Sequence, residues 1–497
     1  MRLFETLLFL ANLFTLFLGS LSLPRAVCWL RHLAPIALLI GVAQMLVEGP
    51  RWPMVPAYAL TGLFFLVWLR PHFAPAGGPA HRKRTHRLAL ALATLGLAFS
   101  AVLPMVLPAF RFPHPSGPCE IGTLTYHWVD ADRPEIFTAD PTDRRELMVQ
   151  IWYPAKATPS SARAPYVRDA HALAAALARL KHFPAFLFGQ LKYAATHAIP
   201  SARVADDAPK YPLLIFLEGA IGFRQMNTFQ VEDLVSHGYI VVGIDQPGTA
   251  AIVVFPDGHQ AAGLSLDQMM PLIHQSYSPA EKAPTLNGQT FEKGIVPYLA
   301  QDVFFVLEQL TALNQADPNA ILTGRLDLQH VGTFGVSLGG IVGGEVCRLE
   351  PRLRACLVMD APVPTDVVRS GLQQPVMWIT RDAETMRLER RRAGGWSEAD
   401  ISEHQTTMRT TFENLRGDGY FLQVPGMFHV NLTDIPYWSP LLSWLGVTGP
   451  INGKRAHRII NAYSLAFFDR HLKGRSAKLL DGPAEQFPEV LFESRGP

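Results

Sequence analysis

This sequence contains few cysteines and has almost no net charge. The 497 residues contain only 4 cysteines, at positions 28, 119, 347 and 356, and their spacing matches no zinc site and no C-x-x-C motif. We therefore expect no metal centre and no disulfide framework, and we expect Cys347 and Cys356 to be buried free thiols. The formal net charge is +2, so a role in binding nucleic acid has no global electrostatic support.

Apolar residues, in contrast, make up 48% of the chain and are concentrated before residue 110. A membrane-spanning helix needs about 20 consecutive apolar residues, with a lower limit near 17. Of the four apolar runs, the first and fourth meet this length, the third is marginal and the second is short. The sequence therefore predicts a transmembrane helical region of about four spans over residues 1–110, or three if the second run does not cross. The runs are Leu7–Leu23, Leu33–Val47, Pro53–Leu69 and Leu88–Leu107.

Basic residues gather in two of the loops between these runs. The third loop carries Arg70, Arg82, Lys83, Arg84 and Arg87, and the first loop carries Arg25 and Arg31. Because cytoplasmic loops are enriched in Lys and Arg, these two loops are predicted to be cytoplasmic. With an even number of spans, everything after residue 110 then lies on the other side. We expect an integral protein of the cell (inner) membrane whose soluble part is extracytoplasmic (periplasmic), and three spans would reverse this orientation.

The rest of the chain has a globular composition. Residues 111–118 are rich in Pro and Gly and are predicted to be a linker. In residues 119–497, buried strand patterns alternate with helical patterns, which predicts an α/β fold with a mostly parallel, doubly wound sheet. Two stretches interrupt the alternation and are interpreted as inserts, near 249–293 and 384–415.

A candidate nucleophile follows one of the predicted strands. The segment Val331-Gly-Thr-Phe-Gly-Val-Ser-Leu-Gly-Gly340 contains the motif G-x-S-x-G, and small and apolar residues suited to a helix start come after it. This motif forms a strand-to-helix turn so tight that the neighbours of the serine must lack side chains. The turn exposes the Ser337 hydroxyl, and the N–H of Leu338 is placed to stabilise an oxyanion.

A serine hydroxyl needs a histidine to accept its proton and an acid to orient that histidine. Two acids follow predicted strands after Ser337: Asp360 comes directly after one strand, and Asp382 comes two residues after the next. Both remain candidates, with Asp360 favoured. Among the later histidines only His429 lies in a loop between the last strand and the final helix; the others are His404, His457 and His471. His404 falls in the charged insert, and the other two flank the final helix.

Several separated segments resemble the plasma-type platelet-activating factor acetylhydrolases, over about residues 118–475. They are Pro-Leu-Leu-Ile-Phe-Leu-Glu-Gly-Ala-Ile-Gly-Phe-Arg (212–224), Leu-Val-Ser-His-Gly-Tyr-Ile-Val-Val (234–242), Gln-Asp-Val-Phe-Phe-Val-Leu-Glu-Gln-Leu (301–310), the interval from the serine to the acid, and Gly-Met-Phe-His-Val-Asn (426–431). The resemblance implies an α/β-hydrolase fold and a calcium-independent serine esterase that needs no cofactor. It implies a triad of Ser337, Asp360 and His429, and an oxyanion hole formed by the N–H groups of Ala220 and Leu338. Glu218 departs from the family pattern, which has histidine at this position.

These observations lead to one functional hypothesis and two alternatives. The hypothesis is a membrane-anchored serine esterase that hydrolyses carboxylic esters with short or modest acyl groups, with small-molecule and phospholipid esters as candidate substrates and the bilayer as its other partner. The first alternative is a lipase, polyester hydrolase or acyltransferase with the same triad. The second is a non-catalytic membrane binding or assembly module. The oligomeric state is not predicted.

Overall fold

The structure is a computed structural model that describes residues 1–20, 32–73, 82–156 and 162–496. The chain divides into two compact units. The N-terminal unit comprises residues 1–110 and 438–440, and the C-terminal unit comprises residues 111–437 and 441–497. Arg25 and Arg31 of the predicted first loop, and Cys28, lie outside the described residues.

The N-terminal unit is helical. Its helices are α1 (Leu3–Ser20), α2 (Leu33–Val47), η2 (Trp52–Met54), α3 (Val55–Phe73) and α4 (Arg82–Val106). Two stretches, Trp52–Arg70 and Leu88–Val106, are long and apolar enough to cross a membrane, whereas Leu3–Leu18 and Leu33–Val47 are apolar but shorter. Residues 21–23 of the predicted first span lie outside the described residues.

Hydrogen bonds join three chain segments at one end of this unit. The Arg2 guanidinium donates to the carbonyl oxygens of Glu48 and Gly49, which follow α2. Arg51, just before η2, donates to the carbonyl of Leu107 after α4. The start of α1, the end of α2, the start of α3 and the end of α4 therefore lie at the same end, so the four helices alternate in direction.

The N-terminal unit exposes large apolar side chains and buries several polar ones. Large apolar side chains point outward on every helix, for example Leu3 (68% exposed), Leu46 (82%), Leu66 (64%) and Leu88 (62%). Buried polar side chains occupy the interior, where Asn12 Nδ2 donates to the Ala57 carbonyl over 3.1 Å. The buried polar residues are Glu5, Asn12, Gln44, Arg51, Thr61 and Ser100. Such an arrangement suits an apolar solvent, because the polar groups satisfy one another inside the bundle.

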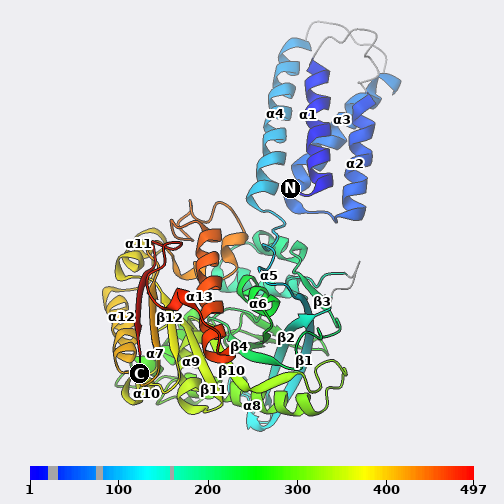
Figure 1. The fold of residues 1–497 in the computed structure, drawn as a ribbon. Coiled ribbons are helices and arrows are strands. Elements are labelled where there is room, and N and C mark those ends of the chain that lie inside the picture. The colour runs from blue at the N-terminus through cyan, green and yellow to red at the C-terminus, as the bar shows by residue number, and fades with distance from the viewer. Residues whose placement is uncertain (21–31, 74–81, 157–161, 497) are drawn as a thin grey trace. The chain divides into compact units, whose positions relative to one another are not determined.

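The C-terminal unit is built on a ten-stranded mixed sheet with the order β14-β13-β12-β11-β10-β4-β5-β2-β1-β3 (Figure 1). The six strands from β5 to β13 in this order are parallel, whereas β2 pairs with β5, and β14 with β13, in antiparallel orientation. The strands are β1 (Glu120–Pro134), β2 (Arg144–Ala155), β3 (Ala198–Pro200), β4 (Tyr211–Leu217), β5 (Ile240–Asp245), β10 (Leu326–Val336), β11 (Leu353–Met359), β12 (Val376–Thr380), β13 (Gly419–Gln423) and β14 (Leu491–Arg495).

Helices cover both faces of this sheet. Consecutive residues of a strand point to opposite sides, so neighbouring residues of one strand show which helix lies on each face. On β10, a Cβ built at Gly332 would lie 3.1 Å from Phe468 of α13 (Gly453–Lys473), whereas a Cβ built at Gly343 of α9 (Leu338–Leu349) would lie 4.0 Å from Thr333 Oγ1 on the other face. Helix α8 (Val296–Gln315) packs beside α9, and α6 (Thr228–Ser236) packs beside α13. The predicted doubly wound α/β fold is confirmed.

The remaining elements lie between or beyond these layers. Residues 111–118, for which the sequence predicts a linker, are part of the C-terminal unit, where Gly117 N donates to Ser236 Oγ over 2.9 Å. The stretch 249–293, interpreted as an insert, contains two short hairpins and a helix. The stretch 384–415, the other predicted insert, consists of two helices with the residues between them and the two residues after the second helix. The elements are α5 (Ala170–Lys181), η3 (Ala185–Tyr193), β6 (Ile252–Val254), β7 (Gln260–Ala262), α7 (Leu266–Tyr277), β8 (Thr285–Leu286), β9 (Gln289–Thr290), α10 (Thr365–Ser370), α11 (Ala383–Ala393), α12 (Glu398–Glu413), η4 (His429–Leu432), η5 (Ile435–Tyr437) and η6 (Lys478–Leu480).

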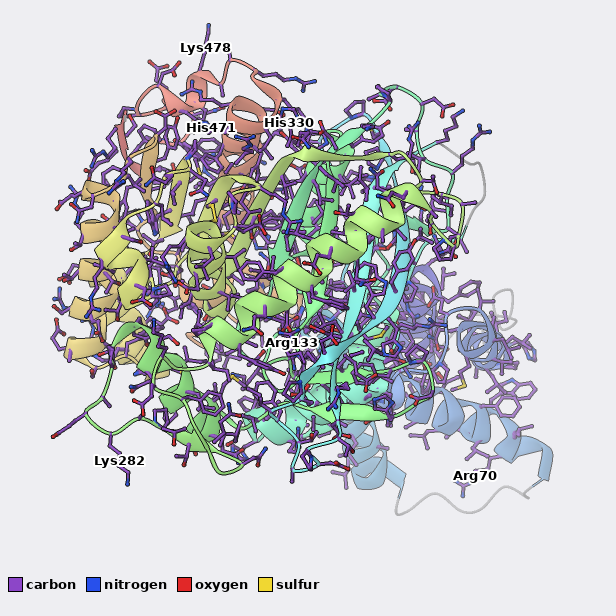
Figure 2. All side chains as sticks on the ribbon, turned by 90° about the horizontal axis from the view of Figure 1, so that it is seen from below. Arg70, Arg133, Lys282, His330, His471 and Lys478 are labelled. Atoms are coloured by element: carbon purple, nitrogen blue, oxygen red, sulfur yellow. A yellow bond between two sulfur atoms is a disulfide. The ribbon has the colours of Figure 1, made fainter. Side chains whose placement is uncertain are left out.

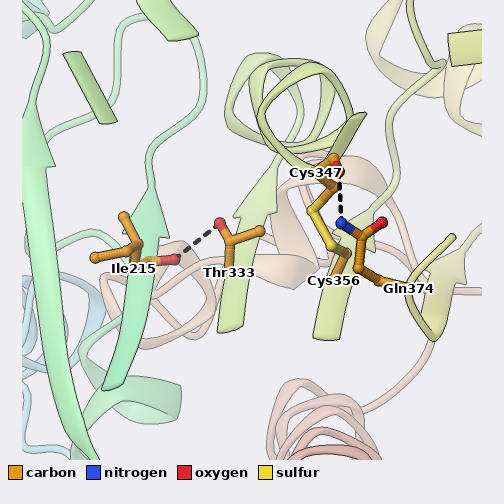
Figure 3. Close-up of a disulfide and its surroundings, with 5 residues drawn as sticks. All are labelled: Ile215, Thr333, Cys347, Cys356 and Gln374. Atoms are coloured by element: carbon orange, nitrogen blue, oxygen red, sulfur yellow. Dashed lines mark hydrogen bonds between the residues drawn. A yellow bond between two sulfur atoms is a disulfide. The ribbon is translucent and has the colours of Figure 1, made fainter. Parts of the chain in front are cut away.

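Cys347 and Cys356 form a disulfide, so the prediction of two buried free thiols is wrong (Figure 3). Cys347 lies near the end of α9 and Cys356 lies in β11, and the short connection between the two elements brings their Cα atoms to 6.6 Å. That separation is within the range that a disulfide can bridge. Gln374 donates to the carbonyl of Cys347 over 2.8 Å and packs beside the bridge.

Candidate active site

Ser337 lies at the turn between β10 and α9 in a strained backbone conformation. Its φ of 56° and ψ of −123° lie outside the regions that most side chains adopt. A Cβ at Gly335 would lie 2.3 Å from the Gly339 carbonyl oxygen, and a Cβ at Gly339 would lie 2.1 Å from the Leu217 carbonyl oxygen. Both glycines of the motif are therefore sterically required, and the strain they permit is typical of functional sites.

The loop after β4 lies against this turn. A Cβ at Gly219 would lie 3.2 Å from the Ser337 Cβ. Ile221 has a φ of 60°, unusual for a β-branched residue, and its N–H donates to the Thr249 carbonyl over 2.8 Å. In the described parts of the chain, the N–H groups of Ala220 and Leu338 form no hydrogen bond. Both predicted oxyanion donors are thus free to bind an oxyanion.

Asp360 and His429 are brought into contact from chain positions 69 residues apart. Asp360 follows β11 directly, and His429 opens η4 in the loop after β13. The Nδ1 of His429 lies 2.5 Å from Oδ2 of Asp360. This contact orients the imidazole, and with Nδ1–H as donor the Nε2 atom carries the lone pair that a general base needs.

No hydrogen bond joins Ser337 Oγ to His429 Nε2 within the described residues. The structure brings together Asp360 and His429, the predicted acid and base, and it places Ser337 at the carboxyl end of β10, next to β11, which Asp360 follows. Catalytic hydrogen bonds are often long in free enzymes and shorten in the complex with substrate.

The other candidates have different partners. Asp382 caps α11, where its carboxylate accepts from Thr385 N over 2.9 Å and from Thr385 Oγ1 over 2.6 Å. His457 contacts the carbonyl oxygens of Asn431 and Thr433, which helps to hold the loop after β13. His471 and His330, labelled in Figure 2, lie together at the amino ends of the strands and line a shallow pocket there. Substrates of open α/β sheets bind at the opposite edge.

A second histidine, His404, contacts Asp360 in the structure. His404 on α12 is 1% exposed, and its Nε2 lies 3.2 Å from Oδ1 of Asp360. An ionised Asp360 can only accept, so Nε2 carries the hydrogen. Burial lowers the pKa of His404, which favours its neutral form. Sequence reasoning missed this contact, although the buried residues Ile401, His404 and Met408 recur at helical spacing and mark this face of α12.

The carboxylate of Asp360 is held ionised by its surroundings. Burial opposes ionisation, but the Arg381 guanidinium and the contacts of both histidines hold the pKa of Asp360 well below its usual range. Arg381 Nε lies 2.7 Å from Oδ2, and Thr380 Oγ1 donates to Oδ1 over 2.9 Å. Arg381 is itself buried, and its guanidinium lies 5.0 Å from the ring centre of Trp396, which contacts both histidines edge-on.

Two further acids, Glu218 and Asp245, lie close to the loop after β4. Glu218 follows β4, and its Oε1 accepts from Gln246 N over 3.2 Å. Burial and the negative charge of Asp245 raise the pKa of Glu218 well above its usual range, which favours its protonated form. Asp245 is also ion-paired with Arg224. Through its hydrogen bond with Gln246, Glu218 links the loop after β4 to the chain after β5.

Residues 106–482 match the model of the family described as platelet-activating factor acetylhydrolase, isoform II. The chain belongs to this family. The family resemblance predicted from separate sequence motifs is thereby confirmed. Within the described residues, no group of three or more His, Cys, Asp or Glu side chains is arranged to hold a metal ion.

Two relatives are identical to the chain at about a quarter of the aligned positions. The platelet-activating factor acetylhydrolase of Cavia porcellus is 24% identical over an alignment of 303 positions, which covers 58% of this chain and 62% of that protein. The alignment thus spans less than two thirds of that relative. A probable 1-alkyl-2-acetylglycerophosphocholine esterase of Arthroderma benhamiae is 23% identical over an alignment of 428 positions, which covers 80% of this chain and 97% of that protein.

A solved structure is also similar. The ferulic acid esterase from Streptomyces cinnamoneus is 29% identical, with a TM-score of 0.60, and the match covers 78% of this chain and 99% of that one. All three proteins are named as ester hydrolases. Their names support the predicted reaction class, hydrolysis of a carboxylic ester.

Proposed function

We propose that the protein is a membrane-anchored serine esterase that hydrolyses carboxylic esters with short or modest acyl groups, including those of phospholipids. The observation that carries this proposal is the contact between Asp360 and His429 at the carboxyl edge of the sheet, beside the strained turn of Ser337. The names of the relatives support the same chemistry.

In the proposed mechanism, Ser337 Oγ attacks the ester carbonyl carbon while His429 Nε2 takes its proton. The C–O π electrons move to the carbonyl oxygen, and the N–H groups of Ala220 and Leu338 stabilise the resulting oxyanion. As the oxyanion collapses, the bond to the alcohol oxygen breaks and His429 returns its proton to that oxygen. Water then attacks the acyl-enzyme by the same steps, which releases the acid and regenerates the serine. Asp360 stabilises the positive charge of His429 in both halves.

The N-terminal unit supplies the proposed anchor. Two of its helices are long and apolar enough to cross a membrane, and all four present apolar side chains outward. The alternating helix directions support four passes, which place residue 107 on the same side as the N-terminus. Combined with the basic first and third loops, this favours an extracytoplasmic C-terminal unit.

The test compares the full-length protein in detergent with its Ser337→Ala variant on p-nitrophenyl esters from acetyl to palmitoyl and on phospholipids of matched acyl length. We expect wild type to be labelled by a fluorophosphonate probe and to hydrolyse the short esters, and the variant to do neither. Ser370→Ala is the matched control, because Ser370 is exposed and its hydroxyl donates to the neighbouring Gly371 carbonyl.

Other outcomes point to the alternatives. Labelling or hydrolysis that persists in Ser337→Ala would exclude this nucleophile. A preference for palmitoyl esters would favour a lipase, and transfer of the acyl group to an added alcohol in preference to water would favour an acyltransferase. A folded wild-type protein that neither reacts with the probe nor cleaves any ester would favour the binding module.

A further inference from the structure

The acid of the proposed triad belongs to a larger buried charge cluster. Arg381, which pairs with Asp360 through Nε, pairs through Nη1 with Oε2 of Glu389. Glu389 lies on α11 and is 8% exposed. The same Oε2 atom accepts the backbone N–H of His429 over 3.2 Å. Glu389 therefore contacts both the cation beside the acid and the main chain of the base.

The charges of this cluster decide how well it can stabilise a protonated His429. Asp360 and Glu389 each carry −1, Arg381 carries +1, and the buried His404 is neutral, so the sum is −1. Without Glu389 the sum is zero, because Arg381 cancels Asp360. A cluster of zero net charge stabilises an imidazolium less than one of −1, since the interaction of buried charges is only weakly screened.

We propose that Glu389 is a positioning residue of the esterase: it offsets the charge of Arg381, so that the negative field of Asp360 reaches His429 in the transition state, and it fixes the main chain of His429. This proposal rests on the proposed function. It gives the helices of the 384–415 stretch a role in the reaction, because α11 brings the glutamate and α12 brings His404.

Charged and titratable groups face His429 from four elements. They are Asp360 after β11, Arg381 after β12, Glu389 on α11 and His404 on α12, while α13 presents His457 to the carbonyl oxygens of the same loop. Protonation of His429 in the free enzyme would abolish its action as a base, so it sets the acidic limb of the kcat/KM profile. The midpoint of this limb therefore reports the net charge of the cluster.

The experiment uses three variants of the full-length protein and p-nitrophenyl acetate as substrate. Glu389→Gln makes the cluster neutral, so the acidic limb should move down by about one pH unit and kcat should fall about tenfold at unchanged KM. Arg381→Met makes the cluster −2, so the limb should move up by a similar amount. The double variant R381M/E389M restores −1, and its limb should return to the wild-type position. Glu384→Gln is the matched control, since Glu384 lies exposed on the same helix and pairs with Arg387.

Opposite shifts that cancel in the double variant are the expected result. An unmoved acidic limb in Glu389→Gln, or single-variant shifts in the same direction, would overturn the proposal, because a merely structural role lowers activity without moving the profile by charge. If Arg381→Met alone does not fold, the other two variants decide, since replacing both partners of a buried pair is better tolerated than removing one. Loss of activity in Ser337→Ala with an unmoved Glu389→Gln profile would refute this inference and leave the proposed function standing.

Discussion

Replacing Asp360 by asparagine separates the charge of this residue from its shape. In the structure, Oδ1 accepts from Thr380 and faces His404, whereas Oδ2 faces His429 Nδ1 and Arg381 Nε. An asparagine that keeps its oxygen toward Thr380 must turn its NH2 group toward His429. Two donors would then oppose each other, so His429 would adopt the tautomer with hydrogen on Nε2. That tautomer cannot accept the serine proton.

Two magnitudes follow from this geometry. The wrong tautomer is expected to lower kcat by about 10⁴-fold, the effect known for the equivalent change in another serine hydrolase, which corresponds to about 5.5 kcal/mol in the activation free energy. The variant also removes the carboxylate partner of a buried arginine, which typically costs about 3–5 kcal/mol of stability. Because Arg381 keeps Glu389 as a partner, we expect the lower end of that range. Hydrolysis of p-nitrophenyl acetate and denaturant unfolding of the purified protein measure the two effects separately.

Asp382→Asn is the matched control for this prediction. Asp382 was the other candidate acid, and in the structure it caps α11. Asparagine caps a helix about as well as aspartate, so both activity and stability should stay close to wild type. A loss of about 10³-fold or more in Asp382→Asn, together with a nearly active Asp360→Asn, would refute the reasoning.

Three further predictions concern pH, covalent structure and topology. Burial lowers the pKa of His457 to about 4, so below about pH 6.5 the unfolded chain binds a proton that the folded one does not. Its contribution to stability should thus fall by up to about 1.4 kcal/mol per pH unit between pH 6.5 and 4, and chemical denaturation of His457→Gln should lack that share. The Cys347–Cys356 disulfide closes a loop with a sequence separation of 9, so its removal in C347A/C356A should lower the free energy of unfolding by about 2–3 kcal/mol. Equal melting curves of wild type with and without reductant would contradict this. An alkaline phosphatase reporter should be active when fused after residue 118 and inactive when fused after residue 80, and the reverse pattern would place the C-terminal unit in the cytoplasm.

The parts of the site that could be predicted from sequence are those fixed by local sterics. Gly335 and Gly339 flank Ser337 because the turn leaves no room for a Cβ at either position, so the motif itself reports the geometry. Asp360 could be placed because it follows a buried apolar run without a gap. The fold class was predictable for the same reason, since strands buried on both faces read as continuous apolar runs.

The parts that escaped prediction depend on contacts between distant segments. The spacing of α12 marks His404 as buried, but no local pattern says that this face of the helix meets Asp360. Glu389 reads as one charge among many in a basic helix. Strand β14 (Leu491–Arg495) was missed because it is short, lies at the edge and has little apolar content. The Cys347–Cys356 bridge depends on how tightly the chain turns between α9 and β11, which the spacing of the cysteines does not reveal.

The disulfide bears on the orientation of the protein independently of the basic loops. The loop charges place the C-terminal unit outside the cytoplasm only if the number of spans is even, and a second helix that failed to cross would reverse that prediction. The Cys347–Cys356 bridge does not depend on the number of spans. Structural disulfides persist in oxidising compartments and are rare in the cytosol, so an oxidised pair favours the extracytoplasmic side by itself. The redox state of this pair in intact cells therefore tests the orientation without a fusion, and a fully reduced pair would favour a cytoplasmic site even if four helices cross.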